Sequence, residues 1–225
     1  MTLRDWTSAR LAKDRDGRGT GVLDVSPVGS RGLIATRAGR PPAYVYCPEA
    51  SAEPFSPDDL DAARREMGEL EFVVVTKRPI AYNTYAHADD LGVVVGSLGA
   101  LHSALRDHDD VGTYKSKNHE FVQSRLSGHR HVARWHRVGY DAYAIERSSG
   151  LRTLVIVTLN PYEVTQEEAY HLINTHPEVD VDALVTTNPS CRGFSPATLE
   201  AVSHAGVGIW TFRDFLSSLG KSWTN

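Results

Sequence analysis

The chain has 225 residues, of which 41% are hydrophobic and 23% charged, and its formal net charge is −4 at pH 7. A chain of this length can form one large domain or two domains of about 110 residues, each with a core. No apolar stretch approaches the roughly 18 residues of a membrane-spanning helix, and no charged-then-apolar segment opens the chain, so we expect no membrane partner and no secretion. The cysteines, Cys47 and Cys191, lie far apart without metal-ligand spacing, which favours a cytoplasmic protein without disulfides.

The first half of the chain predicts a β-hairpin and then a helix. The runs Gly32–Arg37 and Ala43–Tyr46 flank a turn at Gly39 and carry β-branched and aromatic residues, which is typical of paired strands. Ser56 followed by Pro57 predicts a helix start, because serine can cap free amides and proline suits the first helical position.

Two further apolar runs complete this half. Phe72–Val75 is continuously apolar, so we expect a buried central strand rather than a half-exposed one. A loop with Pro79 and a polar segment ending at Gly92 follow. Val93–Val95 then predicts another strand and Leu98–Leu105 a closing helix.

The second half repeats this order of elements. A helix around Glu120 precedes a first strand, and two more strands are predicted on either side of the turn at Gly150. Thr165 and Glu168 predict a capping box, since each side chain can bind the other residue's free amide. The expected strands and helices are Val132–Val138, Tyr140–Arg147, Thr153–Leu159, Ala183–Thr187, a helix opened by Ser195, Val207–Trp210 and Phe212–Leu219.

The match in order, residue type and spacing indicates a duplicated unit. Each copy is predicted to contain a helix, three strands, and then helix, strand, helix, strand, helix. The polar stretch Asp107–Asp110 carries no hydrophobic period and marks the boundary. We therefore predict two α/β domains, residues 1–110 and 111–225, with mixed central sheets flanked by helices, packed as a pseudo-dimer.

The C-terminal pattern resembles a known family. It consists of a Val-Thr-Thr-Asn strand end, a helix opening at Ser195, a Gly-Val-Gly-Ile strand from Gly206, and Phe212 and Phe215 beyond it. This order is similar to the end of Mrr-type restriction endonuclease domains, which have the PD-(D/E)XK nuclease fold. The resemblance spans residues 114–219 and, more faintly, 3–105, and it implies two tandem restriction-endonuclease-like half-domains.

The resemblance also implies a metal site. In that family, an acid on the second strand and the glutamate of an E-x-K motif on the third strand hold Mg²⁺, and the lysine helps to activate water. Asp141 matches the first acid and Glu120 a helix acid, so these two are the implied metal ligands. The third strand, Arg152–Leu159, has neither an acid nor a lysine, and Glu163 is the nearest acid beyond it.

The first half departs further from the family pattern. Arg31 stands at the position of Asp141, and Pro42–Cys47 contains no acid and no lysine. Losing two of three key groups would remove most hydrolytic power, so we expect a catalytically degenerate scaffold without a cofactor. If catalysis is retained, the resemblance leaves Asp141, Glu120 and Glu163 as the catalytic residues and Mg²⁺ as the cofactor.

The segment Tyr114–Tyr140 concentrates positive charge in an otherwise acidic chain. It contains six lysines and arginines but only one acid, Glu120. Arginine beside aromatic side chains suits phosphate binding and base stacking, which predicts a nucleic-acid contact. The alternative to a nucleic-acid contact is a strand whose arginines alternate with apolar residues and simply lie on its solvent-exposed face. The candidate nucleic-acid-binding residues are Lys115, Lys117, Arg125, Arg130, Arg134, Trp135 and Arg137.

Three functional hypotheses follow from the sequence. The first is a nucleic-acid-associated protein on a degenerate nuclease scaffold, with DNA favoured over RNA, in a microbial defence or DNA-processing system. The second is an active Mg²⁺-dependent DNA endonuclease with a displaced carboxylate cluster. The third is a non-catalytic assembly subunit whose repeated halves bind protein partners.

Overall fold

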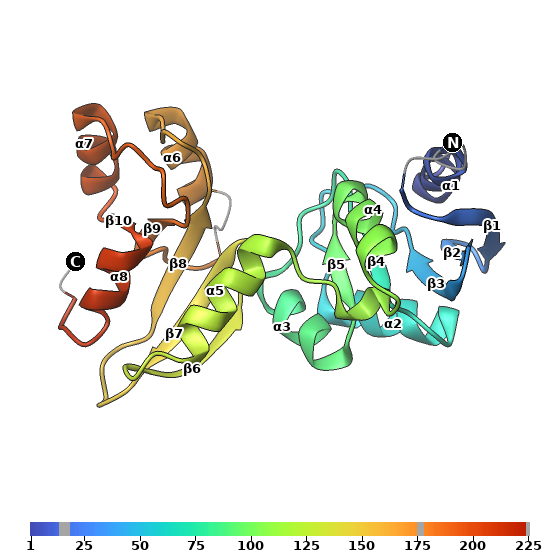
Figure 1. Ribbon diagram of the computed structural model, residues 1–225, viewed down its shortest axis with the longest axis horizontal. Coiled ribbons are helices and arrows are strands. Elements are labelled where there is room, and N and C mark those ends of the chain that lie inside the picture. The colour runs from blue at the N-terminus through green and yellow to red at the C-terminus, as the bar shows by residue number, and fades with distance from the viewer. Residues whose placement is uncertain (14–18, 175–177, 224–225) are drawn as a thin grey trace. The chain divides into compact units, whose positions relative to one another are not determined.

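The computed structural model describes residues 1–13, 19–174 and 178–223 (Figure 1). The chain forms two compact units, Met1–Ser116 and Lys117–Asn225, each an α/β half-domain with its own five-stranded mixed sheet flanked by helices, as the sequence predicts. The first unit ends beyond the expected boundary at residue 110. Val111 is fully buried in the core of the first unit, and its N–H donates to Glu71 Oε1 over 3.3 Å.

The first unit places its sheet strands in sequence order, β1-β2-β3-β4-β5. The first three strands form an antiparallel meander, and the last two run parallel to β3. Parallel neighbours need a crossover helix, which explains the helices that separate β3, β4 and β5. The elements are α1 (Leu3–Lys13), β1 (Val22–Val28), β2 (Gly32–Arg37), β3 (Arg40–Tyr46), α2 (Pro57–Met67), β4 (Phe72–Val74), α3 (Tyr82–Leu91), β5 (Val94–Gly96), α4 (Leu98–Asp107) and the short η2 (Val111–Thr113).

The second unit has the same order, with sheet order β6-β7-β8-β9-β10 and the same strand directions. Its elements are α5 (Lys117–Ser127), β6 (Val132–Arg137), β7 (Ala142–Arg147), β8 (Leu154–Leu159), α6 (Gln166–Asn174), β9 (Ala183–Thr186), α7 (Pro196–His204), β10 (Gly208–Thr211) and α8 (Phe212–Ser218). None of the described helices is both long and apolar enough to cross a membrane.

Helices cover both faces of each sheet, because alternate strand residues point to opposite faces and both sets are apolar. In the second unit, Leu126 of α5 and Phe215 of α8 pack on the face that carries Tyr143. Residues of α6 and α7 pack on the opposite face. The first unit has the same layers, with α1 and α4 on one face and α2 and α3 on the other.

The predicted helix starts are confirmed. Ser56 Oγ accepts from Asp59 N over 3.2 Å while Asp59 Oδ2 accepts from Ser56 N over 3.0 Å, which closes a capping box at α2. Thr165 and Glu168 form the equivalent box at α6, with distances of 2.9 and 3.2 Å.

A buried arginine at the end of the second strand makes equivalent contacts in the two units. Arg37 Nε donates to Pro41 O across the hairpin over 2.8 Å, and its Nη1 donates to Leu105 O at the end of α4 over 3.3 Å. Arg147 Nε donates to Arg152 O over 2.8 Å, and its Nη1 donates to Leu219 O beyond α8 over 3.2 Å. Each guanidinium therefore ties the last helix of its unit to the hairpin of the same unit.

An acid before the fourth strand also recurs. Glu71 Oε2 accepts from Tyr44 N over 2.9 Å, and Asp182 Oδ2 accepts from Val155 N over 2.7 Å. A side-chain oxygen replaces a missing ladder partner in both sheets. Such paired details extend the duplication from the order of elements to individual hydrogen bonds.

Candidate functional site

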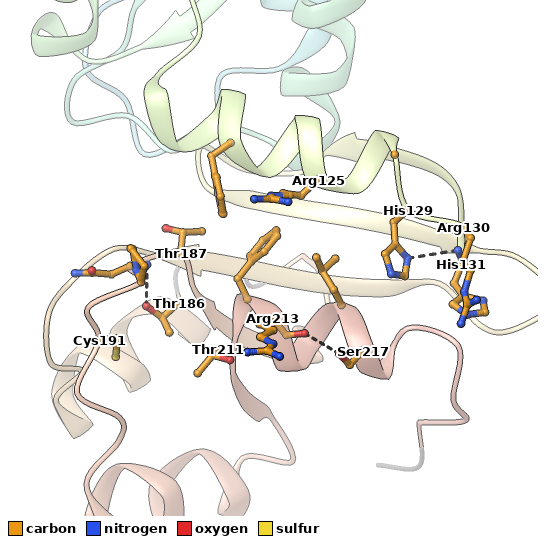
Figure 2. A pocket seen from close by; sticks show the side chains of 16 residues that line it. Arg125, His129, Arg130, His131, Thr186, Thr187, Cys191, Thr211, Arg213 and Ser217 are labelled. Atoms are coloured by element: carbon orange, nitrogen blue, oxygen red, sulfur yellow. Dashed lines mark hydrogen bonds between the residues drawn. The ribbon is translucent and has the colours of Figure 1, made fainter.

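The second unit contains a groove of about 990 Å³ between α5, the turn that follows it, the carboxyl end of β9 and α8. Figure 2 shows Arg125 entering from the α5 side and Arg213 from the α8 side. We call this cavity the basic groove. It is lined by Phe121, Arg125, Gly128, His129, Arg130, His131, Thr186, Thr187, Asn188, Pro189, Cys191, Thr211, Phe212, Arg213, Leu216 and Ser217.

Positive charge dominates the lining of the basic groove. Arg125, Arg130 and Arg213 are permanently charged, and none of the described lining residues is an aspartate or a glutamate. Arginine guanidinium groups offer several fixed donors to an anion, so three of them around one cavity favour a polyanionic ligand.

The position of Arg125 follows from its helix. Arg125 lies four residues after Phe121, so both share one face of α5. The Arg125 guanidinium carbon lies 5.5 Å from the centroid of the Phe121 ring, at cation–π distance. The Phe121 ring in turn lies 5.1 Å from that of Phe212, measured between centroids. The two phenylalanines thus join α5 to α8 beneath the charged side chains.

The turn after α5 contributes a compact His-Arg-His group. The His131 N–H donates to His129 Nδ1 over 3.4 Å, and Arg130 Nε donates to His131 Nε2 over 3.1 Å. Burial lowers the pKa of His129, and the nearby His131 and Arg130 charges lower it further. His129 therefore carries less positive charge at neutral pH than an ordinary histidine does, and the three arginines supply the permanent charge of the groove.

Beside the arginines, the groove exposes apolar surface. Phe121 and Leu216 are only partly buried where they pack against the core of the unit, and Pro189 is exposed. Apolar surface flanked by arginines suits unstacked bases whose phosphates remain on the cationic rim.

At the strand end, the groove meets a polar cluster of four residues from separate segments of the unit. Thr187, which lines the groove, donates from Oγ1 to Asn118 Oδ1 over 2.6 Å. Asn118 Nδ2 lies 3.2 Å from Asp141 Oδ1 and 3.3 Å from Thr158 Oγ1. The side chains come together because Thr158 lies on β8 directly beside Asp141, where its N–H donates to Asp141 O over 2.7 Å. We call these four residues the Asp141 cluster.

Asp141 is the only ionisable member of that cluster. Burial raises the pKa of the Asp141 carboxyl above its ordinary value, against the opposing effects of the Asn118 hydrogen bond and the Arg137 charge. The hydrogen bond to its carboxylate comes from the Asn118 amide, and an amide binds a metal ion more weakly than a carboxylate does.

The acids implied by the family resemblance do not gather around Asp141. Glu120 is exposed on α5, and Glu163 is exposed in the loop after β8. Among the residues that the structure describes, no group of three or more His, Cys, Asp and Glu side chains is placed to hold a metal ion. Asp141, Glu120 and Glu163 therefore do not form such a group.

Of the candidate nucleic-acid-binding residues, only Arg125 and Arg130 line the basic groove. Three others, Lys115, Lys117 and Arg134, are exposed elsewhere. Trp135 packs against the core and donates from Nε1 to Ser127 Oγ over 3.0 Å. Arg137 is 8% exposed. Arg137 is two residues after Trp135 in a regularly paired stretch of β6, so both side chains lie on the inward face of that strand.

Sequence reasoning missed Arg213, which forms the other wall of the groove. It lies far along the chain from the basic segment and reaches the groove only because α8 packs on the same sheet face as α5. The available signal was the helix start, since Thr211 Oγ1 accepts from Asp214 N over 3.2 Å and so fixes the first turn of α8.

Comparison with known proteins assigns no relative. No protein-family model matches the sequence, and neither a curated protein nor a solved structure matches it significantly.

Proposed function

We propose that the second unit binds single-stranded nucleic acid in the basic groove. The observation that carries this proposal is the lining itself, with three arginines and no described acid around a cavity that also exposes aromatic and aliphatic surface. Phosphates supply the matching charge, and each contact releases condensed counterions. A duplex hides its bases, so only an unpaired strand can use both the arginines and the apolar surface.

The scaffold we propose is a catalytically degenerate restriction-endonuclease-like fold, which favours DNA as the nucleic acid. An antiparallel meander followed by two parallel strands supports it, as does Asp141 immediately before the second strand of that meander. Thr158 and Asn118 stand beside Asp141 where a metal site needs further carboxylates. We accordingly propose retention of strand binding and loss of hydrolysis.

The test is fluorescence anisotropy of labelled oligothymidylate and of a duplex of equal length, at low and at moderate salt. We expect tighter binding of the single strand, weakened at least tenfold by Arg125→Ala combined with Arg213→Ala. Arg192→Ala is the matched control, because Arg192 is exposed in the loop before α7 and does not line the groove. Absence of binding at low salt, or equal losses in the control, would refute the function.

The same samples separate binding from cleavage. Incubation of labelled single-stranded and duplex DNA with Mg²⁺ or Mn²⁺ should leave both intact. Cleavage abolished by Asp141→Ala would instead support the active endonuclease and overturn the degenerate scaffold.

A further inference from the structure

The first unit repeats the aromatic–arginine pair of the basic groove on its own first helix. The Arg10 guanidinium carbon lies 5.5 Å from the centroid of the Trp6 ring, the same distance as between Arg125 and Phe121. In both helices a fully buried leucine follows the arginine, Leu11 in α1 and Leu126 in α5, so the two pairs hold equivalent positions over their sheets.

Two further cations accompany this pair. Lys13 ends α1 and is exposed. Lys77 is exposed just beyond the carboxyl end of β4. It occupies the position in the first unit that Asn188, just beyond β9, occupies in the second. The equivalence follows from the pairing, because Phe72 in β4 pairs with Val94 as Ala183 in β9 pairs with Gly208.

The last helix differs between the units in one charged position. Ser97 caps α4 by accepting from Ala100 N over 3.2 Å, as Thr211 caps α8. Gly99 is two residues after the cap of α4, whereas Arg213 is two residues after the cap of α8. The first unit therefore has positive charge on α1 and after β4 but lacks the cation that α8 provides.

We infer that Trp6, Arg10, Lys13 and Lys77 form a second, weaker contact surface for single-stranded nucleic acid. The inference rests on the function proposed for the basic groove, and the positive charge of Arg10, Lys13 and Lys77 suits the same polyanion. Trp6 lies on α1 and is half-buried, and its ring offers a larger stacking surface than that of Phe121 does. The absence of a counterpart to Arg213 makes this surface the weaker of the two.

Two surfaces on one chain change how binding depends on strand length. A strand that reaches only one surface gains one set of contacts, whereas a strand that engages both gains an effective-concentration advantage. The full chain should therefore bind two short oligonucleotides but hold a long strand more tightly than either surface alone.

Isothermal titration of the full chain measures this stoichiometry. An oligothymidylate of about five nucleotides is near the lower limit of site sizes in single-strand-binding modules. We expect two sites of unequal affinity. Arg10→Ala with Lys13→Ala should remove the weaker site only, and Arg125→Ala with Arg213→Ala the tighter one. The matched control is Arg64→Ala with Arg65→Ala, which removes two exposed arginines from α2 on the opposite face of the same unit.

Lys77→Gly provides an independent second variant. Lys77 has a φ of 55°, which glycine adopts without strain, so the substitution removes the charge and leaves the loop conformation accessible. It should weaken the second site several-fold. One site in the wild type that is unaffected by the α1 variant overturns the inference and leaves the groove function standing. If the wild-type chain binds no oligonucleotide at all, the function proposed for the basic groove is refuted instead.

Discussion

Asn118 Nδ2 lies 3.2 Å from Asp141 Oδ1, so this partly buried carboxylate contacts an amide and not a second acid. This pairing leaves Asp141 with a raised pKa, because burial outweighs the hydrogen bond and the Arg137 charge. A carboxyl with a raised folded-state pKa binds protons more tightly in the folded chain, so its ionisation destabilises the fold at neutral pH.

Asp141→Asn should therefore raise the melting temperature at pH 7. The new amide keeps an oxygen for Asn118 and removes the cost of a buried charge. The gain should shrink as the pH falls and disappear below the ordinary aspartate pKa of 3.8, where both folded and unfolded wild-type chains are protonated at this carboxyl. Thermal melts of both proteins between pH 3.5 and 7.5 measure this difference. The prediction is wrong if the melting temperature of the variant, measured relative to wild type, is lower at pH 7 than at pH 4.

The two cysteines should differ strongly in reactivity towards a thiol reagent. Cys47 is fully buried, and burial raises the pKa of its thiol to about 12. Because the thiolate is the reactive form, Cys47 should react only after unfolding. Cys191 is partly exposed in the lining of the basic groove and should react in the native chain. Bound oligothymidylate should slow that reaction at least several-fold, as followed by absorbance or mass spectrometry. Unchanged labelling at saturating oligonucleotide would place the strand elsewhere.

The buried arginines Arg37 and Arg147 should each be intolerant of lysine. A lysine ammonium group cannot span the hairpin carbonyl and the helix-end carbonyls that one planar guanidinium contacts. Each Arg→Lys substitution should lower the free energy of unfolding by about 2 kcal/mol, within the range for hydrogen bonds to charged groups. Urea unfolding of the full chain measures the change, with Arg192→Lys as an exposed control. If only one of the two substitutions lowered the free energy of unfolding, Arg37 and Arg147 would not be equivalent.

Salt dependence should reveal how many phosphates the groove contacts. For single strands, each neutralised phosphate contributes about 0.7 to the slope of log K against log salt concentration. Arg125→Ala and Arg213→Ala should each reduce that slope by about 0.7. Affinities measured over a series of NaCl concentrations give the slopes. A uniform loss of affinity with an unchanged slope would mean that these arginines hold the groove in shape and do not contact phosphate.

Local signals were sufficient to predict much of the fold. The apolar run at Phe72–Val75 is buried and contains β4, and the Ser56 and Thr165 boxes begin helices, because strand burial and capping depend on residues close in sequence. Pairing of the acid Glu71 with Tyr44, and its repetition in the second unit, required the sheet register and could not be predicted from spacing.

The site was only half predictable, for the same reason. Arg125 and Arg130 stand in one basic segment, whereas Arg213 enters from a helix near the other end of the chain. A helix partner on a shared sheet face has no fixed spacing in sequence. Arg137 shows the converse problem, since a count of arginines in the basic segment does not separate the exposed Arg134 from Arg137, which alternation along β6 turns inward with Trp135.

The buried arginines show that the chain is built from two modules. Arg37 and Arg147 each fasten the last helix of a unit to a hairpin within that unit, and the hydrophobic clusters are likewise built from residues of one unit at a time. The polypeptide thus consists of two units, each with its own core, joined at residues 116 and 117. Recombination at that joint can add, delete or exchange a whole module without opening a core, and one copy is free to drift in charge while the other keeps its groove.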